Sequence, residues 1–352
     1  MKDLDVGDAL DGYRIDALVA RGGMATIFRA VDQASGDVVA LKVPHLRYEA
    51  DVVFFDRFRR EEEITLRLDH PNLVRALPPR REKTRVYLVM EYVAGTSLAE
   101  VLRQRGPLPP AQAVEIARQA CEALVYLHAH GIAHHDVKPD NVLLAGDGRV
   151  RLLDFGIAHL ETARKLTVGG LAASIGTPDY MAPEQLRGRR GDARADLFAL
   201  GTMLYEMVTG RLPYEGAGWE ERLEAKRLEH PTPPSAHRAG LAPALDAIVL
   251  RALEPDVAQR YQTAIDVLAD LRDPPPIEAG APLLRSRRRR HLDWNLVGAI
   301  AAIAAALALI AGFAWLSHRR GLETAAEARA ARPAPPARCV TSGRCTEAAA
   351  RP

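Results

Sequence analysis

The first part of the chain is organised in short stretches rich in β-branched and aromatic residues. They occur at residues 13–19, 26–31, 38–43 and 86–91 and are separated by Gly, Asp and Pro, which is typical of strands joined by turns. Between the third and fourth stretches, residues 54–68 carry the charged pattern of a helix. The pattern therefore predicts a small sheet with one long helix.

After Pro107 the pattern changes to that of helices. Residues of one face then recur at helical spacing, at Val114, Ala117, Cys121, Leu124 and His128. Residues 197–208 behave similarly, so the second part is predicted to be mainly helical. A Pro- and Gly-rich stretch at 273–282 is typical of a linker, and the folded domain is expected to end near Leu271.

A long uncharged stretch lies near the C-terminus, at residues 294–316, and covers 23 positions. At about 1.5 Å per residue, a helix of this length spans the roughly 30 Å hydrocarbon core of a bilayer. Trp residues stand at or near both ends, and basic residues flank each side. A buried Ala-rich helix would explain the apolar run but not these flanks. The stretch therefore predicts one transmembrane helix, in contact with membrane lipid, followed by a short extracytoplasmic Ala/Pro-rich tail at 317–352.

The distribution of basic residues predicts the orientation of this helix. The juxtamembrane linker at 273–293 is rich in Pro and Arg, and more positive charge precedes the span than follows it. The positive-inside rule then places the N-terminal domain in the cytoplasm of a single-pass protein of the cell inner membrane. The N-terminal lead, residues 1–12, is acidic and does not resemble a signal peptide. Small residues such as Gly298 and Ala302 leave open a homodimer through the helix.

Composition narrows the class of protein further. The 352 residues are 48% hydrophobic and 26% charged, which excludes a disordered chain. The net charge is +2, and five arginines between residues 285 and 290 make the basic character local, so no nucleic-acid partner is expected. With three cysteines in the chain, a disulfide-stapled main domain is excluded, and whether Cys339 and Cys345 pair stays open.

Candidate chemistry begins with a glycine-containing loop between the first two predicted strands, made of Ala20, Arg21, Gly22, Gly23, Met24, Ala25 and Ile27. Backbone N–H groups at Gly22 and Gly23 can approach phosphate oxygens, although a hairpin turn explains this loop better when it is taken alone. Lys42 lies in the next apolar strand, where burial of its charge requires a partner such as Glu61. A solvated lysine and a glutamate on a helix face are the plainer interpretation of that pair alone.

A more specific signal is the run from His134 to Asn141, which places a carboxylate, a cation and an amide close together. Asp136 can orient an acceptor hydroxyl, Lys138 can neutralise phosphate charge and Asn141 can ligate a metal. Asp154, in an Asp-Phe-Gly sequence, supplies a second oxygen ligand of the kind that Mg²⁺ prefers, and Mn²⁺ can use the same ligands. A turn explains either motif singly, but not both together with the sequence 176–184.

Taken in this order, the motifs resemble a bacterial eukaryotic-like (Hanks-type) Ser/Thr protein kinase over residues 13 to about 271. The resemblance implies an α+β, bilobal fold. Its N-lobe, at 13–93, would be an antiparallel sheet with one helix, and its C-lobe, at 94–272, would be mainly helical. ATP would bind between the lobes, and the γ-phosphoryl group would pass to Ser or Thr hydroxyls of protein substrates.

The same resemblance implies the role of each catalytic residue. Lys42 would contact the α- and β-phosphates and pair with Glu61, Asp136 would be the catalytic base, and Lys138 would mark Ser/Thr specificity. The metal ligands would be Asn141 and Asp154. Thr177 would bond the catalytic aspartate and lysine.

The resemblance also assigns an adenine site and structural supports. The nucleotide would lie against the glycine-containing loop and against Ile27, Ala40, the gatekeeper Met90 and the hinge residues Glu91 to Val93. An ion pair between Glu184 and Arg260 would support the loop that docks the substrate. Asp196 would brace the catalytic loop.

Three departures from the family pattern stand out. Ala20 and Ala25 occupy positions of loop glycines, which weakens the grip on phosphate. His135 replaces an arginine that receives the phosphate of an activation loop, and Thr65 stands where an apolar residue is usual. The altered loop and His135 are the features that favour the alternative, a membrane-tethered pseudokinase scaffold. Retention of the catalytic lysine, glutamate, aspartates and asparagine predicts an active enzyme instead.

Overall fold

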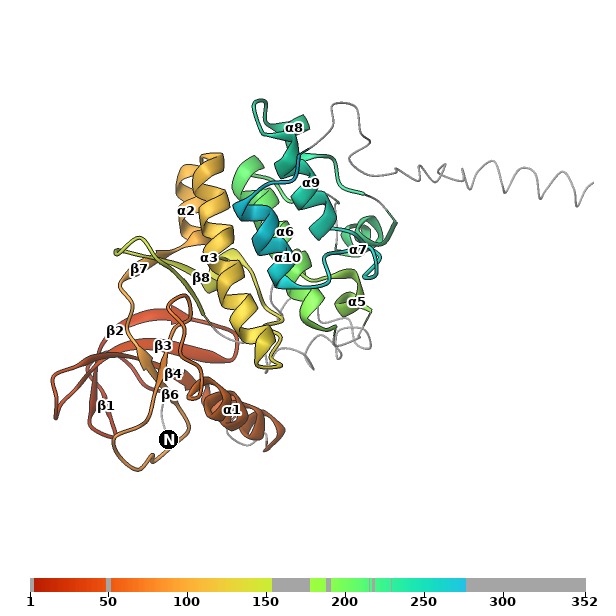
Figure 1. Ribbon diagram of the computed structural model, residues 1–352. Helices are drawn as coiled ribbons and strands as arrows, with labels where there is room; N and C mark the ends of the chain where they lie inside the picture. The colour runs from red at the N-terminus through yellow and green to blue at the C-terminus, as the bar shows by residue number, and fades with distance from the viewer. Residues whose placement is uncertain are drawn as a thin grey trace, which may run out of the picture. The chain divides into compact units, whose positions relative to one another are not determined.

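The computed structural model describes residues 3–48, 52–153, 178–187, 191–214, 216, 219–228 and 230–276. Its N-terminal part is a six-stranded antiparallel sheet in the order β1-β2-β3-β4-β6-β5 (Figure 1). The strands are β1 (Ala9–Leu10), β2 (Tyr13–Arg21), β3 (Ala25–Asp32), β4 (Val38–Pro44), β5 (Ala76–Leu77) and β6 (Leu88–Glu91). A short 3₁₀ turn, Leu46–Tyr48, follows β4 and precedes the helix α1 (Val52–Thr65), which lies beside the sheet.

Period-two alternation along the strands gives this sheet two different faces. Leu41 and Val43 of β4 join Phe28 of β3 in one apolar cluster, whereas the intervening Ala40 belongs to a second cluster with Met90 of β6. The two clusters lie on opposite faces because neighbouring residues of a strand point in opposite directions. Lys42 therefore shares a face with Ala40.

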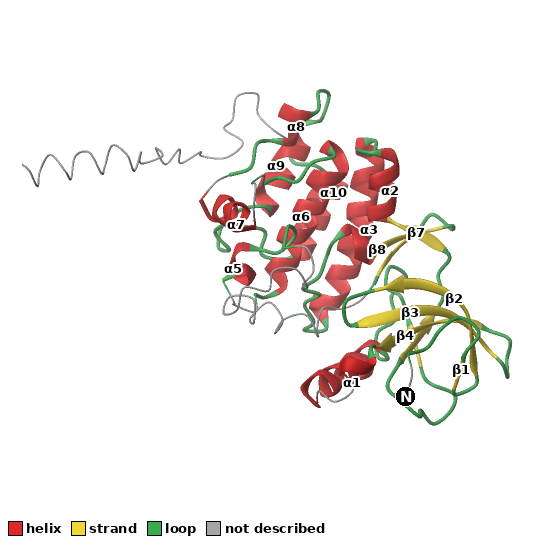
Figure 2. Cartoon of the chain, turned by 180° about the vertical axis from the view of Figure 1, so that it is seen from behind, coloured by secondary structure: helices red, strands yellow, loops and turns green. Residues whose placement is uncertain are grey.

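The C-terminal part is built around a central helix, α6 (Ala193–Thr209), of which nearly every residue from 195 to 208 is buried. The helices α3 (Pro110–Ala129) and α9 (Pro243–Ala252) pack against it, and α10 (Ala264–Arg272) packs against α3. The other helices are α2 (Leu98–Arg105), α5 (Pro183–Leu186), α7 (Trp219–Leu228) and α8 (Pro234–His237), with a 3₁₀ turn at Pro139–Asn141. Figure 2 shows these helices grouped together, apart from the large sheet.

A second, three-stranded sheet lies between the two groups, in the order β7-β8-β9. Its strands are β7 (Gly95–Ser97), β8 (Val142–Ala145) and β9 (Val150–Leu152). Ser97 at the end of β7 is also the N-cap of α2, because its side chain accepts a hydrogen bond from the N–H of Glu100 at 3.2 Å. The sheet thus joins the start of the helical part to the strand that precedes Asp154.

Agreement with the sequence pattern is close for the long elements. The four predicted strands correspond to β2, β3, β4 and β6, and the two predicted helical stretches of the C-lobe to α3 and α6. The helix predicted at 54–68 ends at Thr65 instead. The N-terminal lead is not separate from the N-lobe, because Leu10 of β1 pairs with Tyr13 and is buried. The strands β1, β5 and β7 have only two or three residues, too few to show a period of two.

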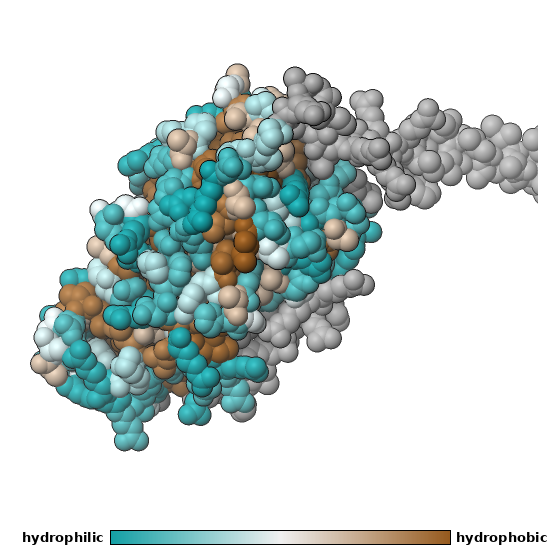
Figure 3. Space-filling view, in the orientation of Figure 1, coloured by the Kyte–Doolittle hydropathy of each residue, from teal (hydrophilic) through white to brown (hydrophobic). Residues whose placement is uncertain are grey.

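Within the described part of the chain, no helix is both long and apolar enough to cross a membrane. The stretch predicted to do so, residues 294–316, lies outside the described residues, as does residue 277 onward of the linker. The face shown in Figure 3 is mainly hydrophilic, with several separate apolar patches.

Candidate active site

Lys42 and Glu61 meet between the sheet and α1. The Nζ atom of Lys42 lies 2.8 Å from Oε1 of Glu61, and the glutamate is only 3% exposed. β4 has β3 on one side and β6 on the other, so Lys42 is held at an interior position of the sheet, opposite Ile27 and Leu88. A buried charge of either sign is costly without its partner, and this pair joins α1 to the sheet in the arrangement expected from the sequence.

Thr65, the polar residue at an expected apolar position, is satisfied within its own helix. Its buried Oγ1 donates a hydrogen bond of 2.6 Å to the carbonyl oxygen of Glu61, one turn earlier. A hydroxyl bonded back to the i−4 carbonyl presents mainly its methyl group to the surroundings. The structure thus explains how a threonine is accommodated there.

The segment from His134 to Asn141 gathers two functional groups, an ammonium and an amide, around one carboxylate. The Nζ atom of Lys138 donates to both oxygens of Asp136, at 2.9 and 2.8 Å. The Nδ2 atom of Asn141 donates to Oδ2 and to the main-chain oxygen of Asp136, both at 2.8 Å. Because its amide nitrogen is the donor, Asn141 keeps its carbonyl oxygen Oδ1 as the atom suited to a hard cation such as Mg²⁺.

His134 connects this segment to the strand that leads to Asp154. Its ring is fully buried, and Nδ1 accepts a hydrogen bond of 3.2 Å from the N–H of Asp136. Nε2 therefore carries the proton and donates to the carbonyl oxygen of Leu153 at 2.9 Å. One imidazole thus ties the backbone of the aspartate proposed as base to the residue just before the proposed metal ligand, a role that sequence reasoning missed.

Asp196, near the start of α6, binds the backbone of the same segment. Its Oδ2 accepts from the N–H of His134 at 2.8 Å and its Oδ1 from the N–H of His135 at 2.7 Å. Oδ2 also lies 2.8 Å from Nε2 of His128. Burial acts to raise the pKa of the Asp196 carboxyl, but the hydrogen bond with His128 and the nearby imidazoles outweigh it, so this pKa lies below its usual value.

The bracing coincides with an unusual backbone conformation at His135. Its φ of +64° lies in the left-handed region, which residues other than glycine rarely adopt. The hydrogen bond from its own N–H to Asp196 helps to hold that conformation. The backbone conformation at His135 is therefore tied to Asp196.

The residues predicted to surround adenine come together on one face of the sheet. Ala40 and Met90 are cross-strand partners in the same apolar cluster, and Ile27 and Val93 pack against that cluster. Leu153, the last described residue before Asp154, packs there as well. The predicted nucleotide pocket and the strand end that leads to the predicted metal ligand thus share one cluster.

The glycine-containing loop connects β2 to β3 as a hairpin, with Ala20 opposite Ile27 and Arg21 opposite Thr26. The N–H of Gly22 donates to the carbonyl oxygen of Ala25 at 2.9 Å, and a Cβ at Gly22 would lie 3.2 Å from that oxygen. A side chain at this position would be tight against the turn, which would have to shift by a few tenths of an ångström. Both interpretations of the loop, as a tight turn and as a phosphate cradle, therefore favour glycine here.

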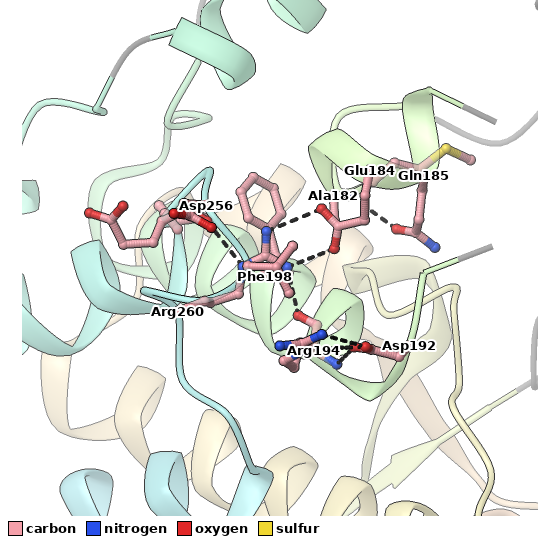
Figure 4. Close-up of polar contacts among 12 residues, drawn as sticks. Ala182, Glu184, Gln185, Asp192, Arg194, Phe198, Asp256 and Arg260 are labelled. Atoms are coloured by element: carbon pink, nitrogen blue, oxygen red, sulfur yellow. Dashed lines mark hydrogen bonds and ion pairs between the residues drawn. The ribbon is translucent and has the colours of Figure 1, made fainter. Parts of the chain in front are cut away.

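Glu184 and Arg260 form a buried ion pair (Figure 4). Glu184 follows residues 178–182, which we call the docking segment because the resemblance implies that they dock the substrate. The guanidinium donates to Oε1 and Oε2 of Glu184 at 2.8 and 3.2 Å, and also to the carbonyl oxygens of Glu254 and Arg194. It lies 5.0 Å from the centroid of the Phe198 ring. The pair joins α5 to the segment between α9 and α10.

Two further contacts on the docking segment were not anticipated from the sequence. The hydroxyl of Tyr180 donates to Glu206 of α6, and the Nζ atom of Lys226 of α7 donates to main-chain oxygens of the segment. Charged residues stand on every side of the helix 219–228, so no pattern marks Lys226 as buried.

Two predicted site residues, Asp154 and Thr177, lie outside the described residues. The candidate phosphoacceptors of the predicted activation loop, Thr162, Thr167 and Ser174, lie outside them as well. Among the residues that are described, no group of three or more His, Cys, Asp or Glu side chains is arranged to hold a metal ion. The donor set formed by Asn141 and its neighbours nevertheless fits a Mg²⁺ ion that takes few protein ligands, because phosphate and water complete such a shell.

Comparisons with known proteins agree with this geometry. A profile of the protein kinase domain matches residues 13–269. The serine/threonine-protein kinase PknB of Mycobacterium leprae is 40% identical over 265 residues, which cover 74% of this chain and 42% of that protein. The probable serine/threonine-protein kinase PknB of Corynebacterium glutamicum is 40% identical over 269 residues, with the same coverage. The chain thus spans less than half the length of these relatives.

Solved structures give the same result for the fold. The crystal structure of the Mycobacterium tuberculosis PknI kinase domain superimposes with a TM-score of 0.61 at 28% identity, covering 78% of this chain and all of that one. A second crystal structure of the same domain gives a TM-score of 0.60 and covers 76% of this chain and 98% of that one. The bilobal arrangement of sheet and helices is therefore shared with them.

Proposed function

Since this chain belongs to the protein kinase domain family, we propose that it transfers the γ-phosphoryl group of Mg-ATP to Ser and Thr hydroxyls of protein substrates. The observation that carries the proposal is the grouping of Lys138 and Asn141 around Asp136. A carboxylate held by two donors keeps a fixed orientation toward an acceptor hydroxyl. Phosphoryl transfer needs mainly such positioning and charge stabilisation.

Each described residue then has a part in the reaction. Asp136 orients the acceptor hydroxyl and takes up its proton, while Lys138 places a positive charge beside the transferred group. Lys42, fixed by Glu61, contacts the α- and β-phosphates. When bound, Mg²⁺ neutralises phosphate charge, and Asn141 with Asp154 would hold it.

The pairing of Lys42 with Glu61 also bears on the pseudokinase alternative. A scaffold that does not transfer phosphate has no need of a buried lysine in contact with its glutamate, an arrangement that costs desolvation energy. The departures that favour the scaffold, at Ala20, Ala25 and His135, leave the contacts of Lys42, Asp136, Lys138 and Asn141 in place.

The proposal extends to the membrane. Residues 294–316 carry no charge and follow an Arg-rich stretch, which supports a single-pass anchor with the kinase domain on the cytoplasmic side. Such an anchor would confine phosphorylation to protein substrates that reach the inner face of the membrane. Small residues in the span are compatible with a homodimer.

Phosphate transfer from radiolabelled ATP to Ser/Thr acceptor proteins in the presence of Mg²⁺ tests the reaction. Asp136→Asn should lower the rate by about 10²- to 10⁴-fold, because the amide cannot accept the proton. Lys42→Met should lower it comparably by removing charge from the phosphate site. Asp147→Asn, the same substitution in the exposed turn between β8 and β9, is the matched control and should leave the rate unchanged. Wild-type rates in Asp136→Asn and Lys42→Met would refute the assignment.

A further inference from the structure

Lys226 is a lysine of α7 with almost no exposed surface. It is 2% exposed, although lysine is among the residues that are rarely buried without a compensating partner. Its Nζ atom donates to the main-chain oxygens of Pro178 at 2.8 Å, of Asp179, and of Met181 at 3.0 Å. All three acceptors belong to the docking segment.

The number of acceptors matches the charged form of the side chain. An ammonium group has three N–H donors and no acceptor, so three carbonyl oxygens satisfy it completely. A neutral amine would have two donors and would turn a lone pair toward one of the oxygens. The site is therefore shaped for a cation, and the ring centroid of Phe198, 5.7 Å from Nζ, adds a further favourable contact.

The same ring links Lys226 to the ion pair below the segment. Arg260, which binds Glu184, lies 5.0 Å from the centroid of the Phe198 ring. α7 makes a second contact as well, because Nε of Arg222 lies 3.3 Å from Oδ1 of Asp179. Lys226 of α7 thus binds the backbone of the docking segment, and Arg260 binds Glu184 in α5, the helix that follows the segment.

A space-filling role alone does not explain this arrangement. A methionine or leucine would fill the same volume without the cost of burying a charge. The lysine instead donates hydrogen bonds to three nearby carbonyls of one segment, which has little regular structure of its own. Such contacts define the path of the backbone rather than the packing of the core.

We propose that Lys226 is a positioning residue for the protein substrate, and that its ammonium group holds residues 178–181 in the conformation that receives the residues flanking the phosphoacceptor. This inference rests on the proposed kinase function. It assigns to α7 a part in substrate binding that acts through the docking segment, while ATP binding depends on the sheet and on the catalytic segment. The acceptor it concerns is a polypeptide rather than a small hydroxyl compound, because an extended chain needs a backbone surface to bind along.

Titration of Lys226 supplies an independent consequence. Burial lowers its pKa to about 7, with the charge of Asp179 acting to raise it and that of Arg222 to lower it further. The positive charge of Arg260 also lies near this site, because its guanidinium contacts the same Phe198 ring as Lys226. Because the pKa of Lys226 in the folded protein is below the ordinary lysine value, its ammonium form is lost as pH rises through about 7. Lys226 then has one N–H donor fewer for the docking segment.

The first test measures steady-state kinetics of the full chain in detergent, with Lys226→Met compared with wild type. The KM for a Ser/Thr acceptor protein should rise about tenfold or more, while the KM for ATP stays within about twofold. Arg227→Met is the matched control, because the neighbouring Arg227 pairs with exposed Glu224 on the surface of the same helix. Its two KM values should both remain at the wild-type level.

The second test needs no variant and so does not depend on the folding of Lys226→Met. In wild type, the ratio of protein phosphorylation to ATP hydrolysis by water should fall as pH rises from about 6 to about 9, because water does not use the docking segment. A constant ratio, or equal changes of both KM values in Lys226→Met, would overturn the positioning role alone. Absence of any transfer by wild type would overturn the proposed function together with this inference.

Discussion

Replacing Arg260 with methionine should destabilise the folded protein severely, because it leaves a buried carboxylate without its partner. The Arg260 side chain is fully buried and that of Glu184 is 12% exposed. Methionine has a similar length but no donor, so both oxygens of Glu184 and the carbonyls of Glu254 and Arg194 lose a hydrogen bond. Removal of one member of a buried ion pair costs about 3 to 5 kcal/mol.

This cost can be read as a change in melting temperature. For a domain of this size, about 1 kcal/mol shifts the midpoint by roughly 2 to 4 °C, so Arg260→Met should lower it by about 6 to 20 °C. Thermal unfolding followed by circular dichroism measures this shift. Glu184→Gln should also destabilise the protein, since it leaves the guanidinium with a neutral partner. The double variant should cost less than the sum of the single ones, by about 1 to 3 kcal/mol.

A matched control is available on α6. Arg194 pairs with Asp192 at the surface, where the two side chains are 30% and 56% exposed. Arg194→Met should therefore cost less than about 1 kcal/mol. Similar losses in Arg194→Met and Arg260→Met, or strict additivity in the double variant, would show that burial of the Glu184 pair does not govern its energy.

Two further predictions concern the segments beyond the described residues. A chain ending at Asp273 should stay in solution without detergent and retain activity, whereas the full chain should require detergent because of residues 294–316. Protease added to spheroplasts tests the orientation of the full chain. Digestion of the kinase domain from outside would contradict the cytoplasmic orientation. Phosphatase-treated enzyme and the triple Thr162/Thr167/Ser174→Ala variant should keep initial rates within about a few-fold of untreated enzyme, because His135 lacks the guanidinium that pairs with a loop phosphate. A loss of about a hundredfold in both would refute this, and would indicate that another basic residue, such as Arg164 or Lys165, takes the place of the arginine.

The sequence alone was sufficient for those parts of the site that lie close together along the chain. The segment from Asp136 to Asn141 is only six residues long and ends in the 3₁₀ turn before β8. The contacts of Lys138 and Asn141 with Asp136 therefore follow from local geometry. Long elements were equally accessible, because α3 and α6 carry many residues on which a helical period can be recognised. Pairing of Lys42 with Glu61 was suggested by resemblance rather than by the pattern around them.

Contacts between distant segments were decided by the tertiary structure. Lys226 stands in a helix with charged residues on all sides, and only its packing against the docking segment gives it three carbonyl partners. His134 likewise acquires its role because β9 brings the carbonyl of Leu153 to within 2.9 Å of its ring. Thr65 appears unsuitable in the sequence and is accommodated by a bond to its own helix. A sequence pattern records periodicity within one element, whereas the burial of a polar group depends on which other backbone groups the fold places within hydrogen-bonding distance.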